Sequence, residues 1–211
     1  MANSSQWPSK WLQKFFTQPG SEFYCCCRPS WIEEECRHAL HRNNDDSDDE
    51  GDKFCAEVIL GRRDSSSASG FSDEQNNEIQ EFYIQLHQQY VASPPGLYDV
   101  KSKYSQGVYG KCPRLICQKQ HLIPMQLSKD EDQKGIAMYC VRCNEIFLPS
   151  YLRHARLDGR AFGLSFAALF FIQYPELIPN QKTYLYNDYA PRVFGFRMKG
   201  LTHQNRFEFI R

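Results

Sequence analysis

Apolar residues recur at helical spacing near the start of the chain. Over residues 10–16 they fall in pairs four positions apart, which predicts a short helix that a Pro-Gly pair then ends. A second helix is predicted to begin at Ser30, because serine is a favourable N-cap and Glu33 stands where a capping box needs its second member. We expect this helix to end near Asn43.

The strongest helical pattern begins at Ser72. This serine is predicted to cap the helix with Gln75 as its capping-box partner, and apolar residues keep helical spacing as far as Tyr90. The segment 93–96, Ser-Pro-Pro-Gly, interrupts the pattern, and residues 97–104 are predicted to add one or two further helical turns. The aromatic residues on the long helix are expected to belong to the core.

Acidic residues crowd the segment between these helices. Residues 45–52 carry six carboxylates in eight positions, a composition that cannot form a buried face. We therefore expect an exposed acidic loop near 43–53, followed by a short helix over residues 54–60.

The pattern changes after residue 107. Cysteine, glycine and proline become frequent, and short strand-like runs replace the helical spacing, which favours a small antiparallel sheet. The sequence therefore predicts an α+β protein with an all-helical N-terminal lobe (1–107), a second lobe with a small sheet (108–178) and an extended C-terminal segment (179–211).

The longest apolar stretch covers residues 161–172. Gly163 and Ser165 interrupt it, and it is shorter than the roughly 20 residues that a membrane-spanning helix needs. We interpret it as a buried segment and expect no membrane partner.

Four of the nine cysteines have metal-ligand spacing. Cys112 and Cys117 form one pair, 22 residues follow, and Cys140 and Cys143 form the second pair, which is zinc-ribbon spacing. Two tight turns of this kind complete a closed tetrahedron of sulfurs, so we predict one structural zinc ion per chain in a zinc-ribbon lobe. Four unliganded thiols and a Cys-x-x-Cys redox centre are the alternatives.

The remaining cysteines and two histidines have no clear place in this site. Cys36, Cys55 and the triplet 25–27 are expected to be structural thiols, with lipidation or redox chemistry of the triplet as the alternative. His121 and His154 are not needed as ligands, and His154 lies in a basic run where a solvated surface position is expected.

Composition limits the function classes. The chain has 25 basic and 25 acidic residues and 41% apolar residues, as in a globular protein without a global field toward nucleic acid or membrane. Its N-terminus has no secretory pattern, so we expect a cytoplasmic or nuclear protein that is not secreted. No protein-kinase signature is present in the sequence. Lysine and arginine residues in the second lobe leave a zinc-ribbon nucleic-acid-binding protein as an alternative, which the neutral charge disfavours.

The order of several motifs resembles one family. Cys112-Pro-Arg, the 22-residue spacer, Asp158-Gly159, Phe162-Gly163 and the segment 191–196, Pro-Arg-Val-Phe-Gly-Phe, are similar to the regulatory (beta) subunit of casein kinase II. The resemblance is good over residues 104–196 and weaker toward the start. It implies a non-catalytic regulator of a serine/threonine protein kinase that dimerises through its zinc ribbon, binds and stabilises the catalytic (alpha) subunit through its C-terminal segment, and modulates the choice of kinase substrates.

The resemblance also assigns partner-binding residues. Phe194 and Phe196 are the implied anchors for the catalytic subunit, with Leu169 packing beside them. Aromatics two positions apart on an extended strand point to the same side, and the alternative is that both fill the chain's own core. Ser47, which acidic residues follow, is a candidate for phosphorylation by casein kinase II, with an inert loop as the alternative.

Two departures from the family pattern stand out. The second cysteine pair encloses Val141 and Arg142, where Pro-Lys is usual in the family. Residues 31–91 have diverged further, which leaves open whether the family's regulatory surfaces are kept there.

Overall fold

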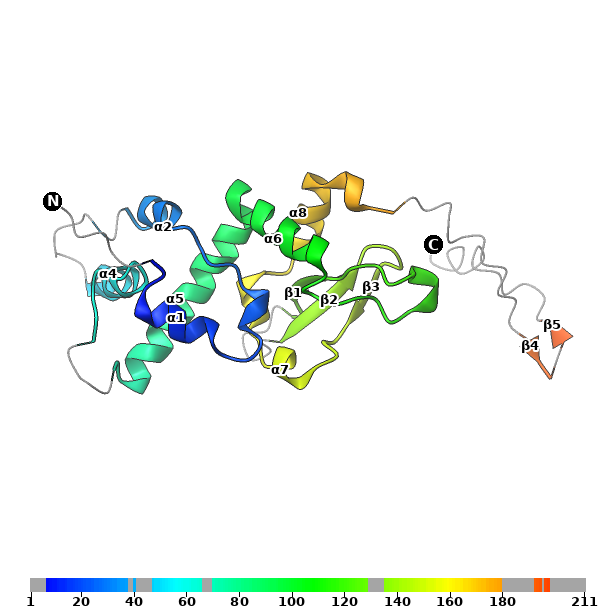
Figure 1. The fold of residues 1–211 in the computed structure, drawn as a ribbon, viewed down its shortest axis with the longest axis horizontal. Helices are drawn as coiled ribbons and strands as arrows, with labels where there is room; N and C mark the ends of the chain where they lie inside the picture. Colours follow the sequence, from blue (N-terminus) through cyan, green and yellow to red (C-terminus); the bar gives the residue numbers. More distant parts are fainter. Residues whose placement is uncertain are drawn as a thin grey trace.

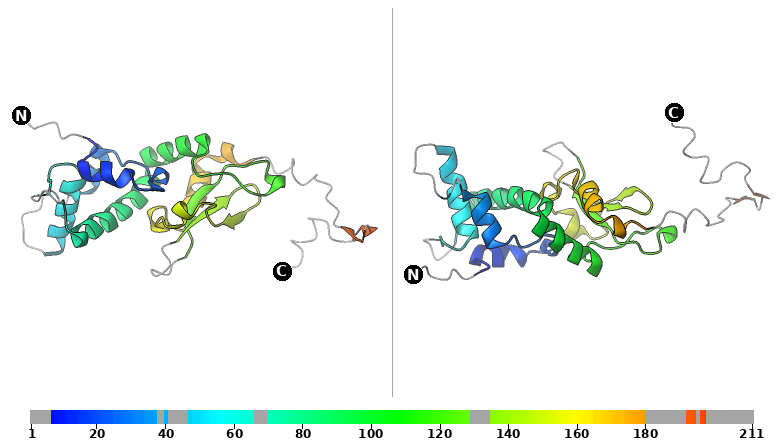
Figure 2. Two further views of the ribbon diagram at one scale, coloured as in Figure 1. Left: turned by 60° about the horizontal axis from the view of Figure 1, so that its bottom comes forward. Right: turned by 90° about the horizontal axis from the view of Figure 1, so that it is seen from above.

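The computed structural model describes residues 7–37, 40, 47–65, 70–128, 135–179, 192–194 and 196–197. Figures 1 and 2 show helices α1, α2 and α4 gathered around α5 at one end of the body, and a small sheet with α8 beside it at the other end. Helices, a three-stranded antiparallel sheet and a separate two-stranded hairpin confirm the α+β prediction. The lobe boundary near residue 108 stays a prediction, and one continuous cluster of buried side chains extends across it.

The first helix is the one that the sequence predicts. α1 (Lys10–Phe16) begins after Ser9, whose hydroxyl accepts a hydrogen bond from the backbone N–H of Leu12 at 3.3 Å. The apolar face buries Leu12 and Phe15. After α1, Gly20 has a φ of 95° and precedes the single turn η1 (Ser21–Phe23); a Cβ on Gly20 would lie 2.8 Å from a backbone oxygen. Only glycine fits this turn without a shift of the neighbouring chain.

The long helix also confirms its prediction. α5 (Asp73–Ala92) begins with the complete Ser72–Gln75 capping box. α6 (Pro94–Gln106) follows directly and is longer than the predicted one or two turns. Ser93 ends α5 and caps α6, and a proline in the first helical position starts a helix without the loss of a hydrogen bond.

One helix prediction was wrong at its N-terminal boundary. α2 (Pro29–Glu35) has Arg28 as its N-cap, with Pro29 at the first position, so Ser30 lies inside the helix and the predicted capping box does not form. α2 itself ends at Glu35, residues 37 and 40 are again helical, and the predicted end near Asn43 lies outside the described residues, so it stays a prediction.

The predicted acidic loop is in large part a helix. α4 (Ser47–Ile59) includes residues 47–53, whereas residues 43–46 lie outside the described part of the chain. Carboxylates in a first helical turn are favourable next to the positive end of the helix dipole. The second half of α4 buries its apolar face, including Cys55 and Ile59, which fixes the helix to the core.

The sheet has three short antiparallel strands in the order β1-β2-β3. They are β1 (Ile123–Gln126), β2 (Ile136–Cys140) and β3 (Glu145–Phe147). The sequence predicts β2 and β3 but not β1, whose second residue is a proline that sequence patterns place outside strands. Because β1 is an edge strand, the missing N–H of Pro124 is tolerated.

The chain after the sheet covers one of its sides. α7 (Leu152–Ala155), η3 (Gly159–Ala161), α8 (Phe166–Gln173) and η4 (Pro175–Leu177) follow in order. The apolar stretch 161–172 is buried at Phe166 and Phe170 but exposed at Ile172, so the prediction of a buried segment holds in part. None of the described helices combines the length and apolar character needed to cross a membrane.

A buried histidine joins three segments of the core. His87 on α5 has no exposed surface, and its Nε2 accepts a hydrogen bond from the backbone N–H of Cys25 at 2.8 Å. Its Nδ1 lies 2.8 Å from the carbonyl oxygen of Ala161, which only accepts, so the ring is neutral with the proton on Nδ1. Burial lowers the pKa of His87 to about 4.

The first prediction concerns stability in mild acid. The unfolded chain protonates His87 near pH 6.5, whereas the folded chain does so only near pH 4. The free energy of unfolding is therefore predicted to fall by up to about 3 kcal/mol from this residue alone as pH drops through that window. Urea unfolding at pH 7 and pH 5 should show a smaller pH difference in His87→Gln than in the parent.

The control is His121→Gln, which removes another histidine, one that is only half-buried. It shows whether the loss of any histidine changes the pH difference. A pH difference of the same size in His87→Gln and the parent would contradict the role of His87.

Candidate metal centre

The first cysteine pair lies on a hairpin-like turn. An isolated bridge pairs Lys111 with His121, and within it the N–H of Cys112 donates to the carbonyl of Gln120 at 2.7 Å. Cys117 ends the single turn η2 (Leu115–Cys117). We call residues 111–121 the first knuckle.

The second pair lies on the turn between β2 and β3. Cys140 is the last residue of β2, and the N–H of Asn144 donates to its carbonyl at 2.9 Å. Asn144 has a φ of 56°, a conformation that asparagine tolerates better than most residues. Cys143 lies in this turn, which we call the second knuckle (residues 140–145).

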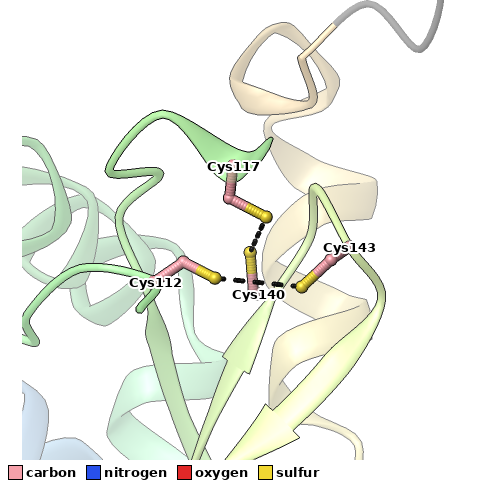
Figure 3. Close-up of side chains that lie close together, drawn as sticks. All are labelled: Cys112, Cys117, Cys140 and Cys143. Atoms are coloured by element: carbon pink, nitrogen blue, oxygen red, sulfur yellow. Dashed lines mark hydrogen bonds between the residues drawn. The ribbon is translucent and has the colours of Figure 1, made fainter. Parts of the chain in front are cut away.

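The four sulfurs converge on one point, as Figure 3 shows. The Sγ atoms of Cys112 and Cys143 are 3.9 Å apart, those of Cys117 and Cys140 are 4.0 Å apart, and all four lie within 4.8 Å of one another. A tetrahedron with metal–sulfur bonds of about 2.3 Å has edges of about 3.8 Å. The predicted ligands therefore come together in a cluster that fits one metal ion.

Burial makes a cation the natural partner of these sulfurs. Three of the cysteines are buried and Cys143 is half-buried. Burial and the neighbouring sulfurs raise the pKa of Cys143 to about 11 and that of Cys117 further. Thiols in such a place ionise at neutral pH only when a positive charge compensates them, and a bound metal ion supplies that charge.

The redox alternative fits this geometry poorly. A Cys-x-x-Cys redox centre works through one pair of sulfurs. Here the sulfurs of Cys140 and Cys143 each contact a sulfur of the first knuckle, and all four cysteines are free thiols.

One histidine prediction was wrong. His154 is buried, with its Nε2 2.8 Å from a carboxylate oxygen of Glu22 and its ring 4.3 Å from that of Phe23. Its helix α7 packs against the turn η1, an association that the basic residues on either side of His154 do not indicate. Neither His154 nor His121 belongs to the sulfur cluster.

The other cysteines agree with the prediction of structural thiols except at one position. Cys25, Cys27, Cys36 and Cys55 are buried, and Cys26 is exposed. Burial raises the pKa of Cys25 and of Cys55 to about 12, which keeps both thiols protonated and unreactive.

The predicted partner-binding residues lie in two places. Leu169 is on α8 and 38% exposed, and Phe194 and Phe196 are 97% and 79% exposed on the hairpin of β4 (Arg192–Val193) and β5 (Phe196–Arg197). This hairpin lies apart from α8 in Figure 1, so the structure does not bring the three side chains together. Their exposure contradicts the alternative in which the two phenylalanines fill the core.

The expected geometry of the phenylalanines was wrong. Phe194 has a φ of 48° and lies in the turn of the hairpin, not on an extended strand with Phe196. Of the remaining candidate, Ser47, the structure shows only that it is the first residue of α4. Its phosphorylation stays a prediction for phosphopeptide mapping, and absence of phosphate after incubation with the kinase would contradict it.

Two knuckles present four sulfurs to one point, on a small sheet beside a helical core, and this arrangement is compatible with a metal-ion site. Residues 10–197 match the family model described as casein kinase II regulatory subunit. The chain belongs to this family, whose members are the regulatory and not the catalytic subunits of the kinase.

Known proteins agree with this assignment. The chain is 28% identical to casein kinase II subunit beta' of Drosophila melanogaster over 95% of its own length and 89% of that protein. It is 30% identical to casein kinase II subunit beta of Schizosaccharomyces pombe over 89% of its length and 78% of that protein. It is 38% identical to the suppressor-of-stellate-like protein of Drosophila melanogaster over 57% of its length and 53% of that protein.

The second prediction separates metal ligands from ordinary buried cysteines. Cys117→Ala should lose the metal ion and unfold roughly 10 °C lower, because the binding free energy of a structural metal is part of the folding free energy. Metal content by plasma mass spectrometry and thermal unfolding check this. Cys55→Ala, equally buried on α4, is the matched control and should keep the metal. Equal metal content in both variants would contradict the site.

Proposed function

We propose that the chain is a regulatory subunit of casein kinase II that forms a zinc-dependent homodimer, binds and stabilises catalytic (alpha) subunits, and modulates the choice of substrates. The observation that carries this proposal is the four-sulfur cluster inside a chain that matches the family model over residues 10–197. A regulatory subunit implies a catalytic kinase partner, and the metal centre supplies the rigid scaffold. The site of action is proposed to be the cytoplasm or the nucleus.

Zinc is the ion that this site favours. Four cysteine sulfurs in a tetrahedral arrangement select zinc or iron, and zinc needs no redox partner and no open position. When bound, the ion would supply only a fixed positive charge that joins the two knuckles. The four cysteines would hold it as a closed set, which suits a structural and not a catalytic role.

Exposed apolar residues at the knuckles support dimerisation through this lobe. Leu115 is 95% exposed between the first two cysteines, and Ile146 and Leu148, which follow the second knuckle, are 51% and 69% exposed. Large apolar side chains grouped on a surface are typical of association sites. In a homodimer the same surface of a second copy would cover them.

The exposed phenylalanines support the role of the C-terminal segment. Phe194 and Phe196 are more exposed than other aromatic residues of the described chain. Aromatic side chains that fill pockets of a partner dominate many interfaces, and their truncation often costs about 2 kcal/mol or more. Leu169, partly exposed on α8, is proposed to join them when the catalytic subunit is bound.

The nucleic-acid alternative has less support. Two basic residues of the second lobe are paired with carboxylates of the same chain: Arg114 with Glu145, and Arg160 with Asp158 and Glu81. Such pairs reduce the positive field that a nucleic-acid surface needs.

The third prediction tests the partner contact. Calorimetry with a purified casein kinase II catalytic subunit should show binding by the parent and a loss of at least roughly 30-fold in affinity for Phe194→Ala/Phe196→Ala. Tyr98→Ala, which removes an aromatic side chain that is 66% exposed on α6, is the control and should bind like the parent. If the parent does not bind, the proposed function is contradicted. If the double variant binds as tightly as the parent, only the assignment of Phe194 and Phe196 as anchors is contradicted.

A further inference from the structure

An arginine of the second knuckle reaches across to the first. Arg142 lies between Cys140 and Cys143, and its Nη1 donates to the backbone carbonyl of Cys117 and to Oε1 of Gln118, each at 3.1 Å. One guanidinium nitrogen therefore contacts a metal ligand's own backbone and the residue after it. The two knuckles are joined here by the protein itself.

The part of the first knuckle that Arg142 contacts has an unfavourable backbone. Gln118 and Lys119, directly after Cys117, have φ values of 51° and 60°. Two consecutive residues other than glycine in the left-handed region persist only where surrounding contacts hold them. The carbonyl of Cys117 accepts from the N–H of Gln120 at 3.0 Å and also from Arg142, so both contacts stabilise this turn.

We propose that Arg142 is a positioning residue that fixes Cys117 against the second knuckle and thereby slows the loss of the metal ion. The inference rests on the proposed zinc centre and assigns the retention of the zinc ion to a residue that is not one of its ligands. Groups that orient metal ligands commonly change metal affinity by roughly 10- to 100-fold when they are removed. Arg142 does so here through the ligand's backbone, which determines where the sulfur lies.

A second arginine provides a matched comparison. Arg114 of the first knuckle also reaches across, with Nη2 3.0 Å from Oε1 of Glu145, but this pair joins two side chains that are 39% and 47% exposed. Exposed pairs of this kind contribute little to stability. Arg114 has the same charge and lies between Cys112 and Cys117 in the sequence, so its removal tests charge without removing a contact to a ligand's backbone.

The experiment measures zinc release from the full chain to an excess of a chromogenic chelator. Arg142→Ala is expected to release zinc roughly 10- to 100-fold faster than the parent. Arg142→Lys keeps the charge but not the planar guanidinium, and should also release zinc faster, although less so than Arg142→Ala. Arg114→Ala should release it at the parental rate. Circular dichroism of the zinc-loaded proteins identifies any variant that has not folded.

The outcomes separate the inference from the proposal beneath it. Parental release rates in both Arg142 variants would overturn the inference while the zinc centre stands. Equal acceleration in Arg114→Ala and Arg142→Ala would overturn it in favour of a pure charge effect. A parent protein purified without zinc would overturn the centre and the inference together, whereas the kinase-binding measurement is independent of both arginines.

Discussion

The convergence of four sulfurs is the constraint on which the second half of the structure depends. The sheet that carries the second knuckle has three short strands of four, five and three residues, and a sheet of this size depends on packing against its surroundings. Twenty-two residues separate the two cysteine pairs, and closing such a loop costs conformational entropy. A metal ion bound by all four sulfurs would offset this cost at one point. The strands could then keep their register.

Helix α5 connects the N-terminal helices to the part of the chain that contains the sheet and α8. This helix contacts α4 and α6 and also η3 and α8, which follow the sheet. His87 strengthens this connection because it binds the backbone at Cys25 and at Ala161, residues far apart in the sequence. The same core that holds the helices together therefore also positions α8, where Leu169 is exposed.

The sequence predicts those features of the fold that depend on local chemistry. Helical spacing locates α1, helical spacing with a capping serine locates α5, and cysteine spacing locates the sulfur cluster, because each of these signals lies within a few residues of the structure it specifies. The predictions that were wrong concern features that depend on contacts between residues far apart in the sequence. α4 extends into an acidic segment because its other end is buried, and β1 forms despite Pro124 because β2 pairs with it.

The hydrogen bonds between residues far apart in the sequence were the hardest part of the structure to predict. Nothing near His87 in the sequence indicates that its ring binds two distant backbone groups, and nothing near Arg142 indicates that it reaches Cys117. The turn at Phe194 is a further example, because an aromatic residue favours an extended strand and is rare in the left-handed region.

Native mass spectrometry of the chain mixed with a casein kinase II catalytic subunit tests the central claim most directly. One complex is expected, with a mass that corresponds to two regulatory chains, two catalytic subunits and two zinc ions. That complex should be lost after zinc is removed. A monomeric chain without metal, and no mass for a mixed complex, would contradict the account.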